Sequence, residues 1–161
     1  MRGLSLFVAG VVVGIFMMLP GAAQQNNDTG VKLNHFGISV KNFDETMNFY
    51  TKTMGFHEAF TIRNKDGKPT LSYIQISRDT FLEIAQAGPD RQPGVTHIGL
   101  QAADLNATIA RLRQAGLKID DPRTGATHAP LANLNDVDGL RLELVEFTPD
   151  SLQKKAVDAW K

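Results

Sequence analysis

The residues with the clearest chemical potential are two histidines and two glutamates at matching places along the chain. His97 follows His35 by 62 residues, and Glu143 follows Glu83 by 60 residues. The sequence contains four histidines and no cysteine, so any metal site must use imidazole and carboxylate ligands. Such a mixed nitrogen and oxygen set suits a borderline divalent ion and leaves coordination positions for water or substrate.

An internal repeat accounts for this spacing. Residues 34–40 (NHFGISV) resemble residues 96–102 (THIGLQA), and each segment leads into a helix that Asn42 or Asp104 can cap. Further strands are expected at residues 58–63, 71–77, 80–85, 118–120, 131–134 and 140–147. The chain is therefore predicted to be α+β, with two βαβββ modules, residues 32–87 and 95–148.

Strand alternation predicts that the four polar side chains share one face. Ile38 points away from His35 along the first strand, and Leu82 points away from Glu83 along the last strand of the same module. The second module repeats the pattern at His97 and Glu143. A single strand histidine or edge glutamate is more often structural or solvated, but four at equivalent positions favour a metal site.

The two ends of the chain have different characters. Residues 1–23 combine one arginine, an uncharged run and a small-residue cleavage site, which is the layout of a secretory signal peptide. The alternative is a short membrane anchor. Export to the periplasm or the exterior is therefore expected. Residues 24–31, which follow the signal peptide, are expected to form a flexible lead-in. Residues 149–161 are expected to form a C-terminal helix that Thr148 caps.

The motifs NHFGISV, FYTKTMGF, FLEI, THIGL and DVDGLRLEL resemble the vicinal oxygen chelate superfamily of glyoxalases, bleomycin-resistance proteins and extradiol dioxygenases. The resemblance covers residues 32–148, and the His/Glu/His/Glu order is similar to that of short glyoxalase I enzymes. It implies that the two modules are paired and form curved mixed sheets around a metal site. It implies one divalent ion per site (Ni, Zn, Co, Mn or Fe(II)) on His35, Glu83, His97 and Glu143. It further implies proton transfer by Glu143, or next by Glu83, on a small substrate with adjacent oxygens, and a homodimer.

Other activities stay open on the same scaffold. Ser39 stands where glyoxalase I has an arginine for glutathione, and Arg91 is a poor substitute for a second one. An extradiol dioxygenase would bind Fe(II) through His35, His97 and Glu143. An epimerase would have the same arrangement of modules, and a resistance-type protein would bind its ligand without catalysis. Candidate substrate contacts are His128, Arg63, Arg78, Arg91, Arg123 and Arg141. The balance of 17 basic and 17 acidic residues excludes a nucleic-acid footprint.

Overall fold

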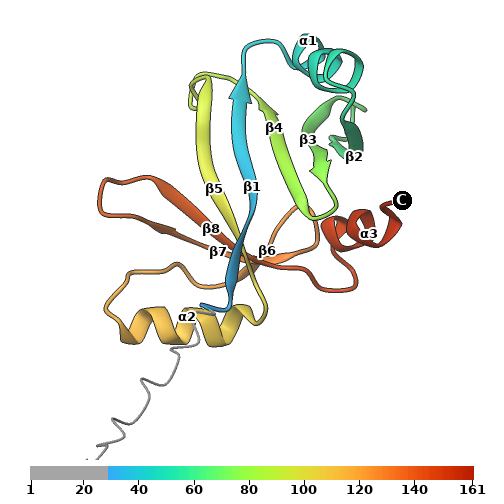
Figure 1. Cartoon of the computed structure of the whole chain (residues 1–161). Coiled ribbons are helices and arrows are strands. Elements are labelled where there is room, and N and C mark those ends of the chain that lie inside the picture. Colours follow the sequence, from blue (N-terminus) through green and yellow to red (C-terminus); the bar gives the residue numbers. More distant parts are fainter. Residues whose placement is uncertain (1–28) are drawn as a thin grey trace, which may run out of the picture.

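A computed structural model describes residues 29–161, so the predicted signal peptide and most of the predicted lead-in lie outside the described residues. Eight strands form one curved mixed sheet in the order β2-β3-β4-β1-β5-β8-β7-β6 (Figure 1). β1 and β5 are antiparallel at the centre, and each is parallel to the last long strand of its own module, β4 or β8. The α+β class and the paired arrangement are confirmed.

The two modules have the same order of elements. The first contains β1 (Val31–Val40), α1 (Phe43–Asn48), the π-helix η1 (Phe49–Thr53), β2 (His57–Arg63), β3 (Pro69–Ser77) and β4 (Thr80–Gln86). The second contains β5 (Gly94–Ala102), α2 (Leu105–Gln114), β6 (Arg123–Thr124), β7 (Pro130–Asn135) and β8 (Arg141–Glu146). Helix α3 (Leu152–Ala159) follows. None of the helices in residues 29–161 is long and apolar enough to cross a membrane.

The helices cover the apolar face of the sheet, as the alternation predicts. The first module buries Ile74, Leu82 and Ile84 beneath the helical segment that begins at Phe43. The second buries a corresponding group in which Leu105 of α2 packs near Leu144 of β8. Because the helices take this face, the opposite face of the same strands is left for polar side chains.

Both predicted helix caps of the modules are present. Asn42 Oδ1 accepts a hydrogen bond from the backbone N–H of Glu45 at 3.2 Å, and Asp104 Oδ1 accepts one from Ala107 at 2.9 Å. Each bond satisfies an N–H that the first helical turn leaves unpaired, and such a cap stabilises a helix by about 1 kcal/mol.

Two local predictions at the ends of the domain are wrong. Val31 belongs to β1 and packs against the α2 core, so the lead-in ends earlier than residue 31. The C-terminal helix begins at Leu152 and Ser151 caps it, because Thr148 instead accepts hydrogen bonds from Ser151 in a preceding turn.

The strand expected at residues 118–120 is also absent. Only one bridge, between Ile119 and Leu134, joins this segment to the sheet. Arg113 Nη2 donates to the carbonyls of Ile119 and Asp120 at 2.8 and 3.1 Å, which occupies acceptors that a longer ladder would need. The short strand β6 forms beyond it and pairs with β7 instead.

Candidate metal centre

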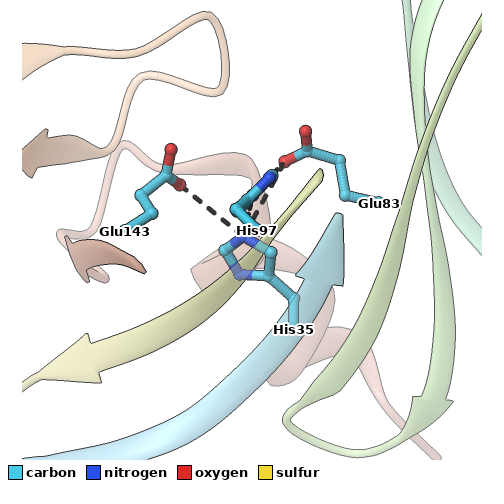
Figure 2. A group of neighbouring side chains, drawn as sticks. All are labelled: His35, Glu83, His97 and Glu143. Carbon is cyan, nitrogen blue, oxygen red and sulfur yellow. Dashed lines mark hydrogen bonds and ion pairs between the residues drawn. The ribbon is translucent and has the colours of Figure 1, made fainter. Parts of the chain in front are cut away.

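The four predicted ligands converge on the polar face of the sheet, one from each of β1, β4, β5 and β8 (Figure 2). One potential ligand atom from each residue lies within 4.8 Å of the other three. His35 Nε2 is 3.0 Å from His97 Nε2 and 3.6 Å from Glu143 Oε1. Both imidazole Nε2 atoms are 3.8 Å from Glu83 Oε2.

This spacing matches the size of a divalent ion. Metal bonds of about 2.1 Å place neighbouring ligand atoms about 3 Å apart and opposite ones about 4 Å apart. The two nitrogens and two carboxylate oxygens are close to that range without any rearrangement of the backbone. The donor set therefore fits an ion such as Zn²⁺, Ni²⁺, Co²⁺, Mn²⁺ or Fe²⁺.

Two glycines make the room for the histidine rings. Gly37 pairs with His97 across β1 and β5, and His35 pairs with Gly99. A Cβ atom at Gly37 would lie 2.0 Å from Cε1 of His97, and one at Gly99 would lie 2.0 Å from Cε1 of His35. The His-x-Gly pattern in each repeat is thus one device, in which the glycine of one strand admits the histidine of the other.

Burial keeps both histidines neutral. It lowers the pKa of His35 to about 3, with further contributions from His97 and Arg141. Burial and the nearby Arg141 and Arg91 lower the pKa of His97 to about 4. Neutral imidazoles are the form that ligates metals, and at these separations they make no salt bridges with the carboxylates.

The pKa values of the two carboxylates shift in the opposite direction, upward. Burial raises the pKa of Glu83, and burial together with the charge of Glu83 raises the pKa of Glu143 to about 7. Two buried carboxylates facing neutral rings are costly to ionise unless a cation balances them. The electrostatics of the group therefore agree with its geometry.

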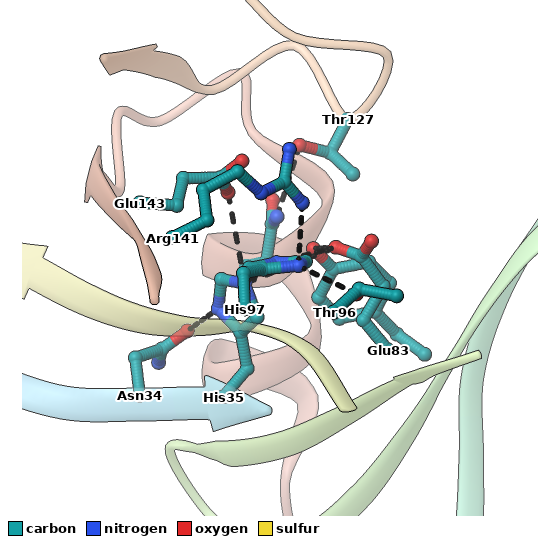
Figure 3. Close-up of polar contacts among 10 residues, drawn as sticks. Asn34, His35, Glu83, Thr96, His97, Thr127, Arg141 and Glu143 are labelled. Carbon is teal, nitrogen blue, oxygen red and sulfur yellow. Dashed lines mark hydrogen bonds and ion pairs between the residues drawn. The ribbon is translucent and has the colours of Figure 1, made fainter. Parts of the chain in front are cut away.

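Neighbouring polar side chains orient both rings (Figure 3). Nδ1 of His35 lies 3.0 Å from Oδ1 of Asn34, whose amide is fixed in turn by the carbonyl of Asp79 at 2.8 Å. Nδ1 of His97 lies 3.0 Å from Oγ1 of Thr96 and 2.6 Å from Nη2 of Arg141. Second contacts of this kind fix the orientation of ligating histidines in metal sites.

Tyr73 and Gln153 support the site, a role that the sequence does not predict for either residue. Tyr73 is 1% exposed, and its hydroxyl donates to Glu83 Oε2 at 2.5 Å. Gln153 of α3 is also 1% exposed and donates to Thr127 Oγ1 at 2.9 Å. The C-terminal helix therefore contributes to the surroundings of the site. Tyr73 lies directly across from Glu83 in the register of β3 and β4, which explains the contact.

The other candidate substrate contacts differ in whether they lie near the four ligands. His128 is exposed with a left-handed φ of 65° and has no hydrogen bond or ion pair to the four-residue group. Of the five arginines, Arg141 and Arg91 line a cavity beside Glu83, whereas the guanidinium of Arg63 donates to Gly67 in a turn.

The fold and the site together define a class of protein built from paired βαβββ modules with a histidine and glutamate group at their junction. The chain belongs to the Glyoxalase/Bleomycin resistance protein/Dioxygenase superfamily, whose model matches residues 32–144. This match confirms the family resemblance found in the sequence motifs.

Named relatives point to two kinds of enzyme. The chain is 25% identical over 126 residues to a probable lactoylglutathione lyase of Vibrio parahaemolyticus, covering 71% of this chain and 90% of that protein. It is 25% identical over 130 residues to a mitochondrial methylmalonyl-CoA epimerase of Dictyostelium discoideum, covering 71% and 78% respectively. A solved methylmalonyl-CoA epimerase from Streptomyces coelicolor is 26% identical with a TM-score of 0.63, covering 74% of this chain and 96% of that one.

Proposed function

We propose that this chain is a metal-dependent enzyme of the glyoxalase type, which moves a proton on a small substrate with two adjacent oxygen atoms. The convergence of four ligand atoms within 4.8 Å is the observation that carries the proposal. His35, Glu83, His97 and Glu143 would hold one divalent ion. When bound, that ion supplies Lewis-acid polarisation of the substrate oxygens, which favours loss of a proton from the adjacent carbon.

The two glutamates have different freedom, which supports Glu143 as the base. Glu83 accepts a hydrogen bond from the hydroxyl of Tyr73, which holds its carboxylate in place. Within residues 29–161 no side chain donates a hydrogen bond to Glu143, and its pKa is raised to about 7, chiefly by burial. A carboxylate with such a pKa accepts and returns a proton near neutrality more readily than one that ionises at 4.

Epimerisation is the second candidate. Glu83 and Glu143 lie on either side of the histidine pair (Figure 2). Carboxylates on two sides of a bound substrate would allow one to remove a proton and the other to deliver one to the opposite face. The epimerases among the relatives support this alternative at 25–26% identity.

Deuterium incorporation is the test, because both candidate reactions exchange a carbon-bound proton. The protein loaded in turn with Zn²⁺, Ni²⁺, Co²⁺ and Mn²⁺ is incubated in D₂O with a methylglyoxal hemithioacetal or with methylmalonyl-CoA. Product with deuterium at the reacting carbon supports the proposal, and Glu143→Gln should lower the rate about 10²–10⁴-fold. Arg63→Ala, far from the site, is the matched control.

Other results would assign the chain to the remaining classes. Oxygen uptake with catechols by the Fe²⁺ form would favour an extradiol dioxygenase. Ligand binding by the metal-free protein without any turnover would favour a resistance-type binding protein. Full metal content in a His35→Ala, His97→Ala double variant would refute the metal site itself.

We also propose that the enzyme is exported and acts as a homodimer. Export is supported by the layout of residues 1–23 in the sequence. The dimer is supported by the oligomers that members of this family often form.

A further inference from the structure

A second cavity lies where the C-terminal helix α3 packs against β2 (Figure 1). Its volume of about 520 Å³ falls in the range of small-molecule sites, about 300–1,000 Å³. The lining includes His57, Ala59, Gln75, Ala156, Ala159 and Trp160. None of the lining residues is one of the four predicted metal ligands, so the cavity is a separate feature of the fold.

Gln75 of β3 presents an unused hydrogen-bond acceptor at this cavity. It is 2% exposed, and its Nε2 lies 2.7 Å from the carbonyl oxygen of Arg78 and 3.5 Å from that of Ala156. Because carbonyl oxygens only accept, these two contacts determine which end of the amide carries the nitrogen. The Oε1 atom at the other end accepts no hydrogen bond from residues 29–161. A molecule in the cavity with an N–H or O–H group can therefore donate to it.

The opposite wall is apolar and contains an aromatic ring. Ala156, Ala159 and Trp160 are spaced three and four residues apart, which places them on one face at the end of α3. The two alanines have only methyl groups, so the indole of Trp160 provides most of the surface of this wall. It is 39% exposed, so the domain leaves part of the indole uncovered. Exposed indole surface beside a cavity is suited to packing against another aromatic ring.

The charges of the lining favour a neutral ligand. No acidic side chain of the described part of the chain lines the cavity, so a cation would have no counter-ion there. The deeply buried group is the carbonyl end of the Gln75 amide, which repels an anion and attracts a hydrogen-bond donor. A few placed polar groups among apolar walls are typical of small-molecule sites.

From these observations we propose that this cavity binds a small neutral aromatic molecule with a single hydroxyl or N–H donor, of the phenol or aniline class. The donor bonds to Oε1 of Gln75, and the ring lies between Ala59 on β2 and the indole of Trp160. The site is independent of the metal group and of the reaction proposed for it.

Trp160 is the only tryptophan of the chain, so its fluorescence reports directly on this cavity. Phenol, with excitation at a wavelength that phenol does not absorb, should change the emission saturably and equally in the metal-free and the Zn²⁺-loaded protein. Ala159→Leu fills the cavity and should weaken phenol binding about 10-fold or more. Ala110→Leu, which makes the same change at an exposed position of α2, should leave binding unchanged.

Toluene tests the hydrogen bond, because it replaces the hydroxyl of phenol by a methyl group. Gln75→Met keeps the length of the side chain and removes the amide oxygen, so the ratio of phenol affinity to toluene affinity should fall about 3-fold to 10-fold. A change of emission that never saturates, as in collisional quenching, would overturn the proposal. So would binding of phenol only by the Zn²⁺-loaded protein, wild-type affinity in Ala159→Leu, or an unchanged ratio in Gln75→Met.

Discussion

Lowering the pH should weaken metal binding through the buried carboxylates, and first through Glu143. The pKa of its carboxyl is raised to about 7 by burial and by the charge of Glu83. The metal binds the ionised form, so below pH 7 each bound ion must displace a proton. The affinity should therefore be constant above pH 7 and fall about tenfold for each pH unit below it, which is about 1.4 kcal/mol per unit.

The histidines do not contribute to this slope. Their pKa values are lowered to about 3 and 4, so both rings stay neutral throughout the range from pH 6 to pH 8. Between these two pH values the affinity should therefore change about tenfold, with roughly one proton released per ion at pH 6 and almost none at pH 8.

Calorimetric titration with Zn²⁺ in two buffers of different ionisation enthalpy measures both the affinity and the number of protons released. Glu143→Gln should bind more weakly and lose the pH dependence. Glu45→Gln, which changes an exposed carboxylate on α1, should keep the wild-type profile. An affinity that does not change from pH 6 to pH 7 in the wild type, or a slope that survives in Glu143→Gln, would refute the reasoning.

Further variants test the support of the site and the origin of the chain. Tyr73→Phe removes the hydroxyl that holds Glu83 and should lower metal affinity about 10-fold to 100-fold while the ring still fills the core; unchanged affinity by titration would contradict that role. Gly99→Ala places a methyl group against the His35 ring and should reduce the metal content and destabilise the fold by about 1–3 kcal/mol, whereas Gly88→Ala, with open space around it, should do neither. Elemental analysis and thermal unfolding measure both effects. The exported protein should begin at residue 24 by intact mass, and a mature chain that keeps residue 1 would contradict a cleaved signal peptide. Analytical ultracentrifugation should give twice the mass of the chain, and a monomer at all concentrations would refute the homodimer.

The arrangement of the site was predictable because it depends on repetition and alternation. Two copies of a strand pattern fix which side chains share a face, and the separation of His35 and His97 nearly equals that of Glu83 and Glu143. The pairing of the two modules around one site was expected only through the family resemblance, and the pairing of β1 with β5, and of each with its parallel partner, was not predicted. That pairing determines which backbone positions face one another.

The contacts around the four ligands were not predictable, because they do not follow from repetition or strand alternation. Tyr73, next to Ile74 in β3, is consistent with an ordinary core residue until its register against Glu83 is known. Gln153 lies on a helix outside the repeat, and nothing in its sequence context separates it from a solvated residue. The contact of Tyr73 depends on the exact register of the β3–β4 hairpin, and that of Gln153 joins α3 to a loop of the second module; strand alternation alone encodes neither.

Gly37 and Gly99 have a role in the site that the repeated strand pattern does not show by itself. In a strand, glycine weakens local structure, so its repeated presence two residues after a histidine calls for a compensating gain. The register of β1 and β5 supplies that gain, because each glycine faces the histidine of the other strand. With a side chain at either position, one ring would be forced away from the other ligands. The two copies of the motif are therefore interdependent, and a substitution in one module acts on the ligand of the other.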